Sequence, residues 1–258
     1  MAIISLQKYT EKRFETLNQL LSKPILKNSV DTFHQIRIEI KKLYAISRFL
    51  QHNKIKFLHK KTMSTLELIF STTGKIREIQ VGLQLIKAAF PELKTHEIVK
   101  ILKKRSEKYQ SDFTKKNLKY EEIDKNSIAK DIEIDKSNLT KYMTLLQESK
   151  NQIVKGPKEL PSMIHTIRVN LKDAAYLSKW LPAEIPNEKD KKFILELGEW
   201  HDLVSLRKLI LKTLTKKEFN ELNTNQLIHV TEKINRRVDL KLIQLIRGYE
   251  RKNKKIKT

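Results

Sequence analysis

The chain has 258 residues, and its 53 lysine and arginine side chains against 30 aspartates and glutamates give it a formal net charge of +23. It contains no cysteine, which excludes disulfides, thiolate metal sites and cysteine nucleophiles. It also lacks the run of about 18 apolar residues that would predict a transmembrane helix. A positive surplus of this size favours a polyanionic partner, and lysine-rich surface charge without a specific partner is the plain alternative.

Helical periodicity dominates the chain, and only 5 glycines and 6 prolines interrupt it. In chain order, the pattern predicts helices over residues 3–22, 31–51, 58–70, 75–90, 94–119, 137–154, 161–181, 188–213, 216–222 and 225–250. Asp31 is the expected N-cap of the second helix. Residues 121–135 are rich in acidic side chains, so we expect a boundary there. The predicted organisation is one domain (1–258) with an N-terminal helical half (1–120), an acidic linker (121–136) and a C-terminal helical half (137–258).

One helical segment occurs twice, at a separation of 131 positions. Both copies have the pattern His-x-x-Arg-x-x-x-Lys, with a further cation seven positions after the lysine. The four cationic positions are His34, Arg37, Lys41 and Arg48 in the first copy and His165, Arg168, Lys172 and Lys179 in the second. On a helix that turns about 100° per residue, these positions lie within roughly 60° of one another. Each copy therefore carries a narrow basic stripe.

Apolar residues flank each stripe on both sides. In the first copy, Ile38 and Phe49 lie on one side of the cations, and Ile36 and Leu43 lie on the other. An ordinary amphipathic helix has a single apolar arc, so two arcs indicate that much of this helix is packed. Because unpaired buried cations are costly, we expect both stripes to line a groove or channel that water and an anion can enter.

A second correspondence follows each stripe. The segment Gly74-Lys-Ile-Arg77-Glu78 resembles Gly198-Glu-Trp-His201-Asp202, at a separation of 124 positions. Together, the two correspondences indicate a duplicated helical unit with pseudo-twofold symmetry. Such a duplication would bring both basic stripes to the same interface.

Two His-x-x-Arg-x-x-x-Lys helices, each followed in order by its glycine segment, resemble the conserved histidine α-helical domain (CHAD) family over about residues 5–250. The resemblance implies an all-α fold of two helical bundles related by a pseudo-twofold axis, with a basic central groove or channel that binds inorganic polyphosphate. The family tends to continue with further arginines after the motif lysine. Here Asp173 and Ala175 stand in the second copy instead, and Asp173 would repel phosphate if it faced the groove.

The polyphosphate-binding residues predicted from the motif and the resemblance combine both stripes with two further cations. They are His34, Arg37, Lys41, Lys42, Arg48, Arg105, His165, Arg168, Lys172 and Lys179. Arginine can direct two donors at phosphate oxygens, whereas lysine acts as a mobile point charge. No catalytic residue, metal ligand or cofactor is predicted.

Three alternatives remain open from the residues. A helical nucleic-acid-binding protein would use the same electrostatics, but no DNA-reading module or aromatic stacking array is visible. A metal site at the paired histidines is disfavoured by the arginine and lysine that follow each of them. A hydrolase built on His201 and Asp202 lacks further ligands at suitable spacing. We therefore expect a non-catalytic polyphosphate-binding protein, in the cytoplasm or at polyphosphate granules, with no signal peptide, no membrane partner and weak nucleic-acid binding at low salt.

Overall fold

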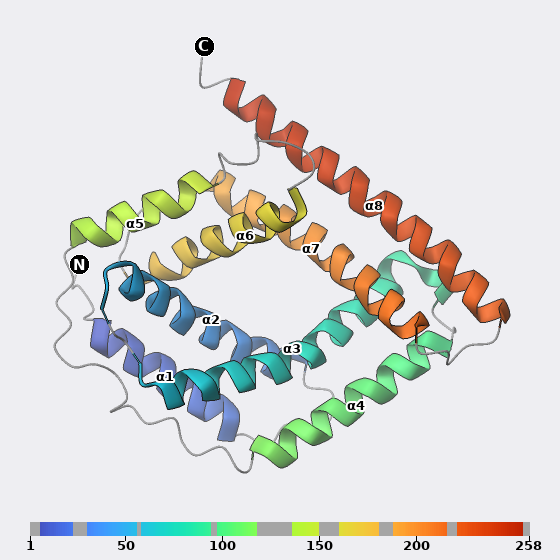
Figure 1. Cartoon of the computed structure of the whole chain (residues 1–258), viewed down its shortest axis with the longest axis horizontal. Helices are drawn as coiled ribbons and strands as arrows, with labels where there is room; N and C mark the ends of the chain where they lie inside the picture. Colours follow the sequence, from blue (N-terminus) through green and yellow to red (C-terminus); the bar gives the residue numbers. More distant parts are fainter. Residues whose placement is uncertain are drawn as a thin grey trace.

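The computed structural model describes residues 6–22, 30–55, 58–93, 97–117, 136–149, 160–180, 188–215 and 221–254. All elements within these ranges are helices, which confirms the all-α prediction (Figure 1). They are α1 (Leu6–Ser22), α2 (Val30–His52), α3 (Lys60–Ala89), the short 3-10 helix η1 (Pro91–Leu93), α4 (Glu97–Asn117), α5 (Lys136–Glu148), α6 (Leu160–Leu177), α7 (Glu188–Leu214) and α8 (Glu221–Lys254). The predicted acidic linker lies outside the described residues, apart from Lys136, which begins α5.

Two predicted helix breaks are wrong. Helix α3 runs without interruption through Gly74, although the sequence pattern divides it into 58–70 and 75–90. Helix α8 likewise passes through 222–225. A glycine inside a helix costs only about 1 kcal/mol relative to alanine, and packing on both sides of α3 readily offsets that. Asp31 lies within the first turn of α2 rather than at its N-cap, where its carboxylate still favours the positive end of the helix dipole.

The helices pack in the same order in the two halves of the chain. In the N-terminal half, α1 packs on α2, α2 on α3 and α3 on α4; in the C-terminal half, α5 packs on α6, α6 on α7 and α7 on α8. The halves meet where α2 packs on α6 and where α3 packs on α7. Figure 1 shows α2 and α6 between α1 and α5, and α3 and α7 between α4 and α8.

One apolar flank of each stripe is fully buried, whereas Ile38 and Val169 on the other flank are half-buried. Ile36, Ile40 and Leu43 of α2 have no exposed surface, and neither do Ile167 and Leu171 of α6. Burying one such side chain contributes about 1.5–3 kcal/mol, so these contacts hold both stripe helices in the interior. The α2 residues belong to a core shared with α1 and α5, whereas the first part of α6 belongs to a core shared with α4, α7 and α8.

A bidentate ion pair joins α2 to α6. Arg48 donates from its Nε and one terminal nitrogen to the two carboxylate oxygens of Asp173, at 2.6 and 2.8 Å. The Asp173 side chain is 4% exposed, whereas that of Arg48 is 41% exposed. Burial raises the pKa of Asp173, and the neighbouring Arg48 partly opposes that rise. Asp173 is thus a buried structural partner of a predicted site cation, paired within the protein.

The unequal exposure of this pair predicts unequal mutational effects. Arg48→Gln leaves the Asp173 carboxylate buried without its partner, so we expect a loss of about 3 kcal/mol in the free energy of unfolding at pH 7. Asp173→Asn leaves a half-exposed Arg48 that water can solvate, so we expect a loss of about 1 kcal/mol. Urea denaturation measures both losses. Equal losses, or a larger one for Asp173→Asn, would contradict this account of the pair.

Candidate anion-binding site

The two basic stripes meet where α2 packs on α6. The structure brings together His34, Arg37 and Lys41 of α2 with His165, Arg168 and Lys172 of α6, since their charges act on one another across the contact. Both histidines are exposed, whereas the two arginines and two lysines are partly buried. The six cations that both motifs predict therefore form a single group, called the cation cluster below.

The lysines of the cation cluster are held in an environment that disfavours their charge. Burial, followed by the positive charges of Lys172 and Arg37, lowers the pKa of Lys41 to about 7. Burial, followed by the charge of Arg168, lowers the pKa of Lys172 to about 8. Within the described part of the chain, neither ammonium group makes a hydrogen bond or an ion pair with the protein. An anion entering the cluster would relieve this repulsion.

Arg37 shows why the first glycine segment contains glycine. One of its terminal nitrogens donates to the Phe70 carbonyl oxygen at 2.5 Å, and the guanidinium lies 3.9 Å from the centroid of the Phe70 ring. A Cβ added at Gly74 would lie 2.8 Å from that nitrogen. At Gly198, the corresponding position in α7, an added Cβ meets nothing within 4 Å. The two glycine segments are therefore alike in sequence but not in packing.

Arg77 is a cluster residue that the sequence analysis did not include among the predicted site residues. Its charge lowers the pKa of both His34 and Arg37, after the larger effect of burial. One of its terminal nitrogens is buried without a hydrogen-bond partner among the described residues. The signal was present in the sequence, because Arg77 occupies the fourth position of the first glycine segment.

His201 occupies the corresponding position in the second half and lies beside the second stripe. The rings of His165 and His201 stack with centroids 5.5 Å apart and planes 28° apart. Burial lowers the pKa of His165, and the charge of His201 lowers it further. The first half thus places a permanently charged arginine beside its motif histidine, whereas the second half places a second imidazole there.

Asp202 of α7 is a carboxylate beside the cation cluster. Its charge opposes the lowering of the pKa of Lys41 and Lys172, and it acts in the same way on Arg77 and Arg168. Among the described residues, the ion pair recorded for Asp202 is with His201, at 3.7 Å from its Nδ1. One carboxylate without a close lysine or arginine partner leaves the cluster with a net positive charge.

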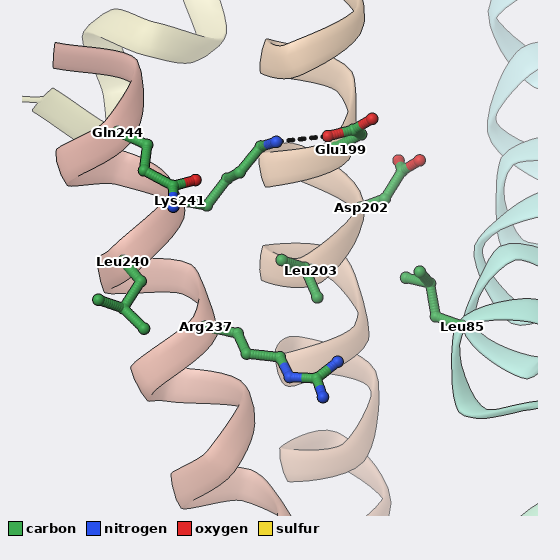
Figure 2. A pocket seen from close by; sticks show the side chains of 8 residues that line it. All are labelled: Leu85, Glu199, Asp202, Leu203, Arg237, Leu240, Lys241 and Gln244. Carbon is green, nitrogen blue, oxygen red and sulfur yellow. Dashed lines mark hydrogen bonds and ion pairs between the residues drawn. The ribbon is translucent and has the colours of Figure 1, made fainter. Parts of the chain in front are cut away.

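Asp202 also lines a pocket of about 400 Å³ between α3, α7 and α8 (Figure 2). Figure 2 shows Lys241 of α8 reaching to Glu199 of α7, while Asp202 lies on the side of α7 that faces Leu85 of α3. Arg237 lies 4.6 Å from the centroid of the Phe90 ring. Because acidic and basic side chains balance in this lining, the pocket does not extend the positive charge of the cluster.

The other predicted site cations have protein partners or lie beyond the stripe. Lys42 donates to Glu39 at 2.6 Å, and Arg13 donates to the same carboxylate at 3.2 Å. Arg105 donates to the Thr213 hydroxyl at 2.9 Å, which ties α4 to the end of α7. Helix α6 ends at Leu177 instead of 181, so the exposed Lys179 lies in the following turn and not on the helical stripe.

Comparison with known proteins identifies the fold. No family model matches the chain, and no curated protein matches it. A solved structure, the crystal structure of the CHAD domain from the plant Ricinus communis, matches with a TM-score of 0.66 over 95% of this chain and 90% of that chain, at 12% sequence identity. The chain therefore has a CHAD-like fold, as the sequence motifs predicted. No helix among the described residues is long and apolar enough to cross a membrane.

The packing of Arg37 predicts different effects of alanine at the two glycines. Gly198→Ala has free space, so the better helix propensity of alanine should raise the free energy of unfolding by up to about 1 kcal/mol. Gly74→Ala displaces the Arg37 guanidinium, so it should lose that gain and weaken anion binding. Urea denaturation and a polyphosphate titration of both variants test this. Equal effects at the two positions would show that Gly74 does not position Arg37.

The lowered pKa of Lys41 predicts how stability depends on pH. An unfolded lysine has a pKa of 10.5, so between about pH 7 and 10.5 the unfolded chain binds more protons than the folded protein. The free energy of unfolding should therefore rise with pH across this window. Lys41→Met should raise it at pH 7 by on the order of 1–3 kcal/mol and flatten the rise. Urea denaturation at pH 7, 8, 9 and 10 measures both effects.

Lys12→Met is the matched control for that measurement, because Lys12 is exposed on α1, away from the cation cluster. It should leave both the stability at pH 7 and the pH dependence close to those of the wild type. If Lys41→Met destabilises the protein at pH 7 and leaves the pH dependence unchanged, the charge of Lys41 carries no cost in the folded protein.

Proposed function

We propose that this protein binds inorganic polyphosphate, without cleaving it, in a basic groove between α2 and α6. The observation that carries the proposal is the cation cluster itself. It holds two arginines and two lysines that are partly buried and whose charges act on one another across a helix contact. Among the described carboxylates, Asp202 acts on Lys41, Lys172 and Arg168 and on the neighbouring Arg77, and Asp31 acts on His34 and Arg77. A protein that needed only stability would have paired or replaced these charges.

A linear phosphate chain fits the chemistry of the cluster. It carries repeated negative charges at short intervals along a thin strand, and two rigid helices present cations at regular intervals to meet them. The guanidinium groups of Arg37 and Arg168 supply forked donors, and the ammonium groups of Lys41 and Lys172 supply compact charges between them. The exposed histidines, His34 and His165, add hydrogen-bond donors where the cluster meets solvent. The CHAD-like fold and the motif resemblance support the same ligand.

Internal duplication would explain why the cations converge. The packing order of the four helices is the same in each half, and α2 and α6 occupy the same place within it. Two contacts between the halves correspond to each other, because each joins the last helix of one half to the end of the third helix of the other half. Arg105 of α4 contacts Thr213 at the end of α7, and Arg237 of α8 contacts Phe90 at the end of α3. We take these correspondences as support for two bundles related by a pseudo-twofold axis.

The competing functions receive less support. The arginines and lysines of the cluster are partly buried between two helices, where a single phosphate strand can reach them but the wide backbone of duplex DNA cannot readily follow. No group of three or more histidine and carboxylate residues within the described ranges is placed to hold a metal ion, so a metal-dependent hydrolase at His201 and Asp202 has no ligand set. The resemblance to the CHAD family also supports a location for the proposed function in the cytoplasm, at polyphosphate granules.

A competition titration tests the proposal. At near-physiological salt, we expect long-chain polyphosphate to displace labelled duplex DNA from the wild type, with at least a tenfold preference by phosphate concentration. Arg37→Gln/Arg168→Gln should lose that preference, because it removes the two forked donors of the cluster. If DNA competes equally and the double variant behaves like the wild type, the basic excess is a general polyanion surface.

The matched control for the competition is Lys12→Ala/Lys192→Ala. It removes the same number of positive charges from exposed positions on α1 and α7, so general electrostatic attraction falls by a similar amount. The control should keep the preference for polyphosphate. Phosphate release in the presence of Mg²⁺ or Mn²⁺, abolished by Asp202→Asn, would replace the binding function with a hydrolase.

A further inference from the structure

Lys41 and Lys172 are the two groups of the site whose positive charge the protein stabilises least. Both are partly buried, and within the described ranges neither makes a hydrogen bond or an ion pair. The charge of Lys172 has the largest effect on Lys41 of any neighbouring charge. Two neighbouring ammonium groups that repel one another and are only partly balanced by Asp202 cost free energy, and loss of a proton from either one reduces that cost.

The surroundings of the pair come from every helix packed around it and are mostly cationic. The charged and titratable groups in or beside the cluster are Asp31, His34, Arg37 and Tyr44 of α2, Arg77 of α3, His165, Arg168 and Tyr176 of α6, and His201, Asp202 and Lys208 of α7. On α1, Arg13 is bonded to Glu39, and on α6, Asp173 is bonded to Arg48. Asp31 and Asp202 are therefore the carboxylates in this group that make no ion pair with a lysine or arginine among the described residues, and only Asp202 acts on Lys41 and Lys172 themselves.

Arginine and lysine respond differently to this environment. The guanidinium groups of Arg37 and Arg168 keep their charge at any pH near neutrality. Lysine, by contrast, readily shifts its pKa when buried, so Lys41 and Lys172 are the members of the cluster that release protons when no anion is present. A bound phosphate chain brings negative charge close to both ammonium groups and raises their pKa again.

We propose that binding of a phosphate chain to this protein is coupled to the uptake of protons by Lys41 and Lys172, so that affinity falls as the pH rises above neutrality. This inference rests on the proposed polyphosphate function and adds that binding at the same site is regulated by pH. The ligand-free protein holds its lysines partly neutral, which limits repulsion in the empty cluster. The polyanion restores their charge as it binds, and a more acidic medium therefore favours the bound state.

The size of the effect follows from the two lysines. At pH 8, Lys41 is mostly neutral and Lys172 about half neutral in the ligand-free protein, since their pKa values are about 7 and about 8. If binding returns both to the charged form, each binding event takes up between about one and two protons at this pH. By linkage, the dissociation constant should rise on the order of tenfold between pH 7.5 and 8.5.

The experiment is isothermal titration of the full chain with long-chain polyphosphate at pH 8, in two buffers that differ in ionisation enthalpy. The internal phosphate groups of a long chain carry no titratable proton at this pH, so the buffer dependence of the enthalpy reports protons taken up by the protein. We expect uptake of between about one and two protons for the wild type. Lys41→Arg/Lys172→Arg keeps both charges fixed, so it should bind with uptake close to zero.

Lys12→Arg/Lys192→Arg is the matched control, because it makes the same change at two exposed lysines and should keep the wild-type uptake. Binding by the wild type without proton uptake overturns this inference and leaves the proposed function intact. Absence of binding at any pH overturns the proposed function, and the inference with it. Uptake that persists in the Lys41→Arg/Lys172→Arg variant assigns the protons to other groups and also overturns the inference.

A measurement on the ligand-free wild type tests the inference even if the double variant fails to fold. In wild-type protein labelled at the lysine ε-carbon, two resonances should titrate near pH 7 and 8, well below the 10.5 of an ordinary lysine. Single Lys41→Arg and Lys172→Arg variants assign these resonances. If both lysines titrate near 10.5 in the ligand-free protein, the site holds no neutral lysine and the coupling does not exist.

Discussion

The packing of α2 on α6 is the contact on which the rest of the structure depends. The two stripe helices are held in place by separate hydrophobic cores, one containing Ile36 and Leu43 of α2 and the other containing Leu171 of α6, and none of these side chains has exposed surface. Each of them stabilises the fold by about 1.5–3 kcal/mol, which works against the repulsion between the cations where α2 packs on α6. The hydrophobic effect thus holds like charges close to one another without pairing them.

The protein pairs the cations around this contact with carboxylates, whereas among the described residues those at its centre have no carboxylate within ion-pair distance. Arg48 is bonded to Asp173, and Lys42 shares Glu39 with Arg13. Glu39 and Asp173 are occupied in these pairs, and Asp202 is the carboxylate whose charge acts on Lys41, Lys172 and Arg168 of the cluster and on the neighbouring Arg77. Because an unpaired buried charge lowers stability, retaining several of them at one place supports the binding function proposed above.

The sequence predicted where helices occur more accurately than where each helix begins and ends. Regular apolar spacing located the eight α-helices found among the described residues, and the repeated motif located the stripes. The break predicted at Gly74 is wrong because glycine was interpreted as a helix end, whereas α3 needs it inside the helix so that the Arg37 guanidinium can approach the backbone. Arg77 was part of a recognised segment, but a single position in a motif does not show that its side chain reaches the neighbouring stripe.

The sequence by itself determined the helices, the excess of positive charge and the alignment of cations along two of the helices, because these follow from local periodicity and composition. Only the tertiary structure decided which cations have partners. Asp173 is adjacent to Lys172 in the chain, yet its carboxylate binds Arg48 on another helix, although it still lies close enough to Lys41 for that charge to act on it. Charge pairing depends on distances between helices, and no pattern along one helix contains those distances.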